Sequence, residues 1–238
     1  MSEDRRFEFE IGASREEVWR ALVDPTALQG WFASEARVSP QVGGEWFIAH
    51  GDYAEASTID ELVPNERLAA SFEGKGVEFT LEGRVGTTVL RIVQSGFTDG
   101  ELDSLERSWD GYVQTLRHFL TRHADESAQS RYVYAFAPLN VEQARAVLPR
   151  TLPSDAEVVD DSARGLIARV PALGDGIHRA SVEGRDSNVV VWVHLVAYGA
   201  GIARLDDIAK RVDSRLTTAV SEASAAKELP FQDRKPGA

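Results

Sequence analysis

The most constraining feature of the sequence is a long amphipathic segment, residues 101–123, which follows a series of short segments of alternating polarity. Its apolar side chains recur at steps of three and four residues, which makes one broad stripe on a helix. The stripe consists of Leu102, Leu105, Trp109, Tyr112, Val113, Leu116, Phe119 and Leu120. The apolar stripe of such a helix must be buried against another layer. An antiparallel sheet that curls around the helix buries this stripe together with its own inner face. The sequence therefore predicts an α+β architecture.

Period-two alternation and turn residues locate the strands before this helix. In the first strand, residues 6–13, the side chains of Phe7, Phe9 and Ile11 share one face and those of the glutamates between them share the other. The later strands are expected at 45–50, 57–62, 68–72, 77–85 and 88–94. Their even spacing indicates an antiparallel meander.

Two short helices are expected between the first strand and the others. Ser14 precedes Glu17 by three residues, which is the spacing of a capping box at a helix start. The dipeptide Asp24-Pro25 ends that helix. Thr26 is expected to cap the second helix, over residues 27–32.

Residues 131–226 repeat this order in a shorter form. A strand at 131–138 is followed by a helix that Asn140 caps, by three strands and by a helix over 205–225. The three strands are expected at 165–170, 179–182 and 188–198. At an offset of 125 residues, Glu17, Arg20 and Ala21 recur as Glu142, Arg145 and Ala146. We therefore expect a degenerate second copy of the first fold.

The expected organisation follows from these segments. Residues 1–124 form a first domain, a polar linker spans 125–130, and a smaller α+β domain spans 131–226. The remaining tail, 227–238, is expected to be disordered.

Composition excludes several classes of protein. The chain has 238 residues, of which 43% are hydrophobic and 27% are charged, the usual range for globular proteins. It has neither an 18-residue apolar run nor an apolar N-terminal segment, so we expect no membrane span and no secretion signal. The absence of cysteine favours a cytoplasmic protein and excludes thiol chemistry. Residues 1–124 carry 22 acidic and 12 basic side chains, which makes nucleic-acid binding an unlikely role for them.

Several motifs in residues 6–123 together resemble a known family. They are Ile11-Gly12-Ala13-Ser14 with the helix up to Leu22, Asp24-Pro25, Trp31, Gly43-Gly44-Glu45, Pro64-Asn65-Glu66-Arg67-Leu68, Gln94-Ser95-Gly96-Phe97 and Ser108-Trp109-Asp110-Gly111-Tyr112. In this order they resemble the START-like helix-grip (SRPBCC) superfamily and, within it, bacterial proteins related to the activator of the 90-kDa heat-shock protein ATPase. The resemblance implies a curved antiparallel sheet that grips the last helix, with a hydrophobic cavity between them. Many relatives have a second Trp and Gly-Pro after Trp31, where this chain has Phe32-Ala33-Ser34.

A ligand cavity in such a fold would lie between the sheet and the helix. Its candidate wall consists of Trp31, Phe32, Trp46, Ile48, His50, Phe72, Phe79, Trp109, Tyr112, Val113 and Leu116. Any one of these side chains is more simply explained as ordinary core packing.

Two polar side chains could take part in such a site. His50 shares a strand face with Trp46 and Ile48, so it would lie at the cavity edge as a hydrogen-bonding or acid/base group. We favour the simpler alternative, a strand-end histidine near solvent. Arg91 could anchor a ligand carboxylate, but we favour a position on the outer face of its strand.

Other chemistry has little support in the sequence. His118 and His123 are five residues apart on the predicted helix and are not expected to share a face, so we expect no metal site. The motif G-x-S-x-G of serine hydrolases and the Gly-rich loops that bind phosphate are both missing from the sequence. We accordingly expect no cofactor and assign no catalytic residue.

The strand at 188–198 contains the run VVVWVHLV, which is apolar on both faces. Such a strand is covered on both sides. The helix of its own domain can cover one side, so Trp192 and His194 are expected at an interface with the first domain or with a second copy of the protein.

Three functions follow, in order of preference. The first is binding of a small apolar or amphipathic ligand in the cavity, without catalysis. The second is a role as a chaperone co-factor, which the resemblance and the acidic first domain support. The third is a cyclase or hydratase with His50 and Tyr112 as acid/base groups.

Overall fold

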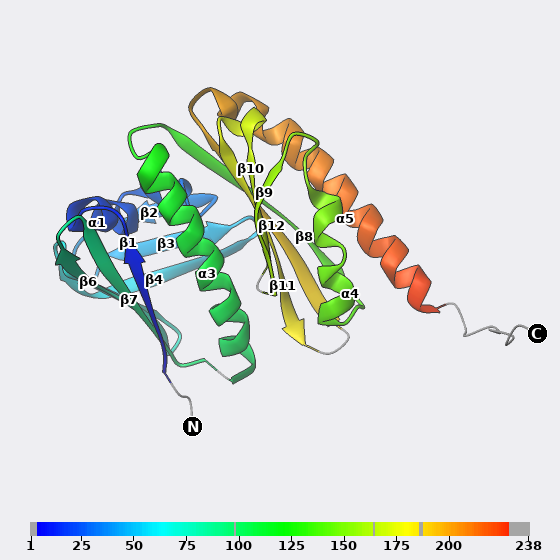
Figure 1. Ribbon diagram of the computed structural model, residues 1–238. Helices are drawn as coiled ribbons and strands as arrows, with labels where there is room; N and C mark the ends of the chain where they lie inside the picture. Colours follow the sequence, from blue (N-terminus) through cyan, green and yellow to red (C-terminus); the bar gives the residue numbers. More distant parts are fainter. Residues whose placement is uncertain (1–3, 98, 164, 186–187, 229–238) are drawn as a thin grey trace, which may run out of the picture.

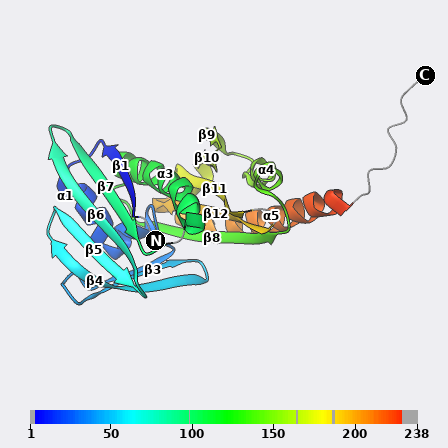
Figure 2. The same cartoon turned by 90° about the horizontal axis from the view of Figure 1, so that it is seen from below.

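The computed structural model describes residues 4–97, 99–163, 165–185 and 188–228 (Figure 1). Two antiparallel sheets lie on opposite sides of one long helix, α3 (Asp99–Arg122), and a second long helix, α5 (Leu205–Glu228), covers the outer side of the second sheet (Figures 1 and 2). The fold is thus α+β, as the sequence predicts. We call residues 4–122 the first unit and residues 128–228 the second unit.

The first unit is a curved seven-stranded sheet with the strand order β1-β7-β6-β5-β4-β3-β2. Its strands are β1 (Arg5–Ile11), β2 (Glu35–Val38), β3 (Glu45–His50), β4 (Tyr53–Val63), β5 (Arg67–Phe72), β6 (Lys75–Arg84) and β7 (Thr87–Ser95). Two helices, α1 (Arg15–Val23) and α2 (Pro25–Gln29), connect β1 to β2. The predicted capping box is confirmed at α1, where Ser14 Oγ accepts from the Glu17 N–H and Glu17 Oε2 accepts from the Ser14 N–H.

The second unit is a five-stranded sheet with the strand order β8-β12-β11-β10-β9. Its strands are β8 (Ala128–Ala137), β9 (Glu157–Ser162), β10 (Gly165–Val170), β11 (Gly176–Arg185) and β12 (Asn188–Tyr198). Helix α4 (Val141–Arg145) follows β8, and three short 3-10 segments complete the unit: η1 (Leu148–Thr151), η2 (Pro171–Leu173) and η3 (Gly199–Arg204).

Both sheets have the same topology. In each unit the first strand pairs with the last, the other strands run back as a meander, and a long helix follows the last strand. This order is the reduced helix-grip arrangement that the element pattern predicts for the second half of the chain. The predicted offset of 125 residues between the two copies is wrong by one residue. The two equivalent helix caps, Ser14 and Asn140, are 126 residues apart.

Helix α3 packs between the two units. It contacts β1 of the first sheet and both β10 and β11 of the second. One hydrophobic cluster therefore contains Phe79 of the first sheet, Leu116 of α3 and Tyr198 of β12. The burial of this helix consequently depends on both sheets.

Strand β12 is buried on both faces, as its composition predicts. Val191, Val193 and Leu195 belong to the core under α5. The alternate side chains include Val196 and Tyr198, which belong to the core around α3. The sequence predicted that either the first domain or a second copy of the protein covers this second face. In the structure, the first unit covers it.

Some elements differ from the sequence predictions. Strands β2 and β9 were not predicted, because β2 has only four residues and most side chains of β9 are exposed. The second helix begins at Pro25, and Asp24 caps it in place of Thr26, since Asp24 Oδ1 accepts from the N–H groups of Thr26 and Ala27.

The boundaries between the predicted domains also differ in detail. Strand β8 begins at Ala128, so half of the predicted linker 125–130 belongs to the second sheet. Helix α5 continues to Glu228, past the predicted start of the tail. The side chains of Leu102 and Leu105 and the rest of the tail lie outside the described residues.

Candidate functional site

A cavity of about 390 Å³ lies between the first sheet and α3. Strands β3 to β7 contribute its floor, Ser108, Trp109 and Tyr112 of α3 contribute one wall, and Glu183 of β11 reaches it from the second unit. The size is within the usual range of small-molecule sites, a few hundred cubic ångströms. The cavity is therefore large enough for a small organic molecule.

The apolar wall consists of aromatic rings held in fixed orientations. The ring of Phe32 stacks on that of Trp109 with centroids 5.6 Å apart and on that of Trp46 at 6.2 Å. Phe79 packs behind both indoles.

The Trp46 Nε1–H donates to the Leu22 carbonyl at 3.1 Å. The Trp109 Nε1–H donates to Gln94 Oε1 at 2.8 Å. Because the indole N–H groups are satisfied within the protein, the rings offer a ligand their apolar faces.

The inner end of the cavity is polar. His50, at the end of β3, packs against Phe32, Tyr112 and Tyr132 with ring centroids 5.0, 5.7 and 5.1 Å away. The Tyr132 hydroxyl donates to the Phe32 carbonyl at 2.6 Å and lies 3.2 Å from the Tyr112 hydroxyl. Side chains of both units thus meet at this end.

Two residues of the second unit pack behind this polar end, outside the lining of the cavity. His194 stacks on Tyr132 with ring centroids 4.2 Å apart. The buried guanidinium of Arg179 lies 3.7 Å above the ring centre of Tyr112 and donates to the Ser108 carbonyl at 3.3 Å. This arrangement places a permanent positive charge beside the tyrosine hydroxyls.

Burial controls the protonation of the two histidines. It lowers the pKa of His50 to about 3, and the nearby charge of Arg179 acts in the same direction. Burial also places the pKa of His194 well below its ordinary value. Both rings are therefore neutral at pH 7. The Nε2 atom of His50 and both ring nitrogens of His194 are buried without a hydrogen-bond partner, which is uncommon for buried polar atoms.

The structure divides the predicted wall residues into three groups. Those that line the cavity are Phe32, Trp46, Ile48, His50, Trp109 and Tyr112. Trp31, Phe79, Val113 and Leu116 lie in the surrounding core, and the Trp31 indole donates to the Ala21 carbonyl. Phe72 is 38% exposed at the end of β5, where the sheet extends beyond its helical cover, so its assignment to the wall is wrong.

The preferred placement of His50 near solvent was also wrong. The β3–β4 turn that follows His50 packs on the second unit, where Gly51 approaches Tyr132, and this contact buries the imidazole nitrogen. Arg91 does lie on the outer face, as favoured, where it pairs with Glu8 and Glu82 at 2.8 Å each.

Two of the polar groups at this end, Arg179 and His194, were not assigned to the cavity from the sequence. His194 and Trp192 were expected at an interface, and both lie on the face of β12 toward the first unit, with Trp192 packed on Tyr53 and Tyr134. Arg179 carries no local signal, because its position depends on the packing of β11 across α3.

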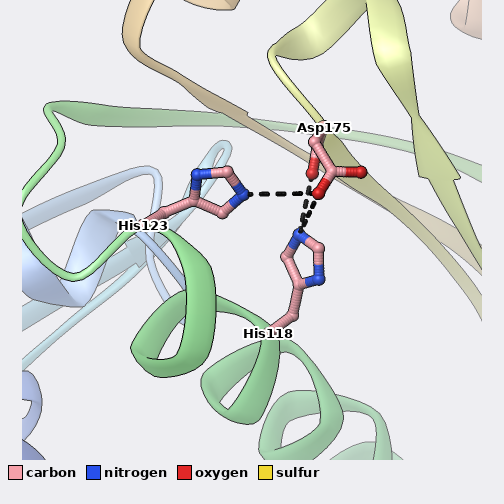
Figure 3. A group of neighbouring side chains, drawn as sticks. All are labelled: His118, His123 and Asp175. Carbon is pink, nitrogen blue, oxygen red and sulfur yellow. Dashed lines mark hydrogen bonds and ion pairs between the residues drawn. The ribbon is translucent and has the colours of Figure 1, made fainter.

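A second polar cluster lies at the other end of α3, where His118, His123 and Asp175 face one another (Figure 3). The ring centroids of the two histidines are 5.1 Å apart. The expectation that these histidines would not share a face was wrong, because α3 ends at Arg122 and His123 follows the helix. Burial lowers the pKa of His118, so that ring is neutral at pH 7.

The curved sheet around a long helix, with a cavity between them, defines a protein of the helix-grip class. Residues 12–121 match the family model described as Activator of Hsp90 ATPase homolog 1-like protein. This match confirms the resemblance for that part of the chain. No curated protein matches the sequence.

Several solved structures are similar to the chain. Protein MLL2253 from Mesorhizobium loti is 24% identical, with 51% of this chain and 98% of that chain covered and a TM-score of 0.47. The Aha1 dimer from Colwellia psychrerythraea is 19% identical over 50% of this chain and 96% of that chain, with a TM-score of 0.46. DynU16, a protein in the dynemicin biosynthetic locus, is 20% identical over 94% of this chain and 98% of that chain, with a TM-score of 0.45.

In the part of the chain that the structure describes, no helix is both long and apolar enough to cross a bilayer.

Proposed function

We propose that the protein binds one small amphipathic molecule in the cavity between the first sheet and α3. The observation that carries the proposal is a cavity of about 390 Å³ with an aromatic wall at one side and a polar end made by both units. Pockets of this composition, mostly apolar with a few convergent polar groups, are typical of small-molecule sites.

The lining indicates the chemistry of the ligand. An apolar, ring-containing part would lie against Phe32, Trp46 and Trp109, which line the cavity. A polar group would point to His50 and Tyr112, which supply a neutral imidazole and a hydroxyl. The positive charge of Arg179 beside Tyr112 favours an oxygen-bearing or anionic group at this end.

Filling the cavity should abolish binding while the fold is retained. Ala70 lies on β5 and lines the cavity, so Ala70→Leu adds three carbon atoms to the space that the ligand would occupy. We expect the affinity for 1-anilinonaphthalene-8-sulfonate, an amphipathic fluorescent probe, to fall at least tenfold, which corresponds to about 1.4 kcal/mol. Fluorescence titration of the full chain measures this change.

The matched control is Ala69→Leu, which adds the same atoms to the opposite face of the same strand. This variant should bind the probe as the wild type does, and circular dichroism should show that both variants are folded. Equal probe affinity for the wild type and folded Ala70→Leu would contradict the proposal.

A second candidate function is a chaperone co-factor role. The family match over residues 12–121 and the excess of acidic side chains in that half of the chain favour it. If acidic side chains make the contact, capture of the 90-kDa chaperone should be strong at low salt and weak at 0.5 M salt, because exposed charges are screened above about 0.1 M. Absence of capture at low salt would exclude this candidate.

The burial of His50 weakens the third alternative, an enzyme that uses His50 and Tyr112. With its pKa lowered to about 3, the imidazole carries no proton to donate at pH 7 and is a weak base. The polar end is therefore better suited to hydrogen bonding than to proton transfer.

A further inference from the structure

We propose that His118, His123 and Asp175 form a binding site for a divalent transition metal ion of the zinc type. One ligand atom from each residue lies within 4.8 Å of the others. The His118 Nε2 and His123 Nε2 atoms are 3.9 and 3.8 Å from Asp175 Oδ2. A metal with bonds of about 2.0–2.2 Å needs ligand atoms somewhat more than 3 Å apart, so a small movement would complete the site.

The orientation of His123 is the strongest support. Its Nδ1 lies 2.9 Å from Glu126 Oε1, and because a carboxylate accepts hydrogen bonds, Nδ1 carries the hydrogen. In a neutral ring Nε2 then presents a lone pair. The side chain is only 7% exposed, and Nε2 has no hydrogen-bond partner while it faces the Asp175 carboxylate, which is also an acceptor (Figure 3). Two acceptors that face each other, one buried and one half-buried, are a favourable setting for a cation.

The surroundings of His123 resemble the outer shell of known metal sites. Ligating histidines usually donate their second ring N–H to a carboxylate, which fixes the ring and raises its basicity. Glu126 occupies that position. The ring of Tyr198 stacks on His123 with centroids 4.0 Å apart and an interplanar angle of 8°, which holds the imidazole in place.

Asp175 is held by the loop between η2 and β11. Its own φ is 56°, in the left-handed region, and the preceding Gly174 has φ 72°. A Cβ atom on Gly174 would lie 2.3 Å from the Tyr198 carbonyl oxygen, so only glycine allows this approach to β12. The second unit thus fixes the carboxylate against the end of α3.

Three groups must rearrange when a metal binds. His118 Nε2–H donates to the Asp175 carbonyl oxygen at 2.7 Å, so the ring hydrogen would move to Nδ1 and that hydrogen bond would be exchanged for the metal bond. Arg122 and Arg169 lie 2.9 and 3.6 Å from the Asp175 carboxylate and compete with a cation. Both arginine side chains are about a third or more exposed and can turn to solvent, and exposed ion pairs contribute little.

Two imidazoles and one carboxylate are a ligand set typical of zinc, with room for water at a fourth position. Cobalt and nickel accept the same donors. Because His118 lies near the end of α3, His123 directly follows the helix and Asp175 belongs to the second unit, a bound ion would connect the two units.

The test uses full-length protein freed of metal with a chelator and then titrated with zinc chloride. We expect one zinc ion per chain by isothermal titration calorimetry, a rise in Tm on zinc addition, and d–d absorption bands of a four- or five-coordinate site with cobalt. His123→Gln and Asp175→Asn should lose these signals. Each variant is compared with itself in chelator, so a change in basal stability does not affect the result.

Two further variants separate a metal site from a cluster held by ion pairs alone. Glu126→Gln should weaken zinc binding by roughly 10- to 100-fold, the usual effect of a lost outer-shell carboxylate. Arg169→Gln removes a competing charge and should leave binding equal or tighter. Failure of the wild type to bind stoichiometric zinc, or zinc binding that Asp175→Asn and His123→Gln leave unchanged, would overturn the proposal.

Discussion

Lowering the pH from 7 to 5 is expected to reduce the free energy of unfolding by several kcal/mol. His178 is fully buried and His50 is half-buried with its Nε2 atom out of contact with solvent, and burial lowers their pKa values to about 4 and about 3 from 6.5. His194 shifts in the same direction. Below pH 6.5 the unfolded chain binds protons at these rings and the folded chain does not, so the lost stability grows until the pH reaches the folded pKa values.

The size of this effect follows from the pKa difference. A pH of 5 is about 1.5 units below the ordinary pKa of a histidine. Each unit of this difference corresponds to about 1.4 kcal/mol in the free energy of unfolding. His50 and His178 together should therefore cost about 4 kcal/mol, which is a large part of a typical domain stability of about 5–15 kcal/mol. Urea unfolding at pH 7, 6 and 5 measures it.

The control for this prediction is His178→Gln, whose side chain can keep a hydrogen bond with Thr151 Oγ1, now 3.1 Å from His178 Nε2. The pH-dependent loss between 7 and 5 should shrink by about 2 kcal/mol in this variant. A free energy of unfolding that does not change between pH 7 and pH 5 would show that the histidines titrate normally.

Replacing Leu116 with alanine is expected to destabilise both units at once. Leu116 is completely buried in the C-terminal half of α3 and belongs to the cluster that includes Ile177 of β11 and Tyr198 of β12. Loss of a fully buried leucine side chain costs about 2–5 kcal/mol. Because α3 packs on both sheets, hydrogen exchange of amides in β7 and β11 should accelerate together.

An exposed position on the same helix provides the comparison. Thr121→Ala changes a residue on the solvent side of α3 and should alter stability by less than about 0.5 kcal/mol. Faster exchange in β7 with unchanged exchange in β11 of Leu116→Ala would mean that the second unit is stable without α3.

Local patterns predicted most of the elements correctly. The capping box at Ser14 and the alternation of β3, β5 and β7 require only neighbouring residues, so they can be recognised in a sequence. Strand β9 has exposed or half-buried side chains along its whole length, because it forms the edge of the second sheet. The alternation that identifies a strand arises from burial on one face, and β9 lacks it.

The candidate cavity was only partly predictable. Trp46, Ile48 and His50 alternate on one strand, and Trp109 and Tyr112 are three residues apart on α3, so their common side could be inferred. Arg179 and His194 reach the polar end because the second sheet packs on α3, and no short-range pattern encodes that contact. The same is true of Asp175, which approaches His118 from a loop 57 residues away in sequence.

The most direct test of ligand binding in the cavity is a crystal structure of the full chain grown with 1-anilinonaphthalene-8-sulfonate. We expect the aromatic rings of the probe to lie against Phe32, Trp46 and Trp109, with the sulfonate toward His50 and Tyr112. Probe density only on the outer surface, with the cavity between the first sheet and α3 unoccupied by the probe, would contradict it.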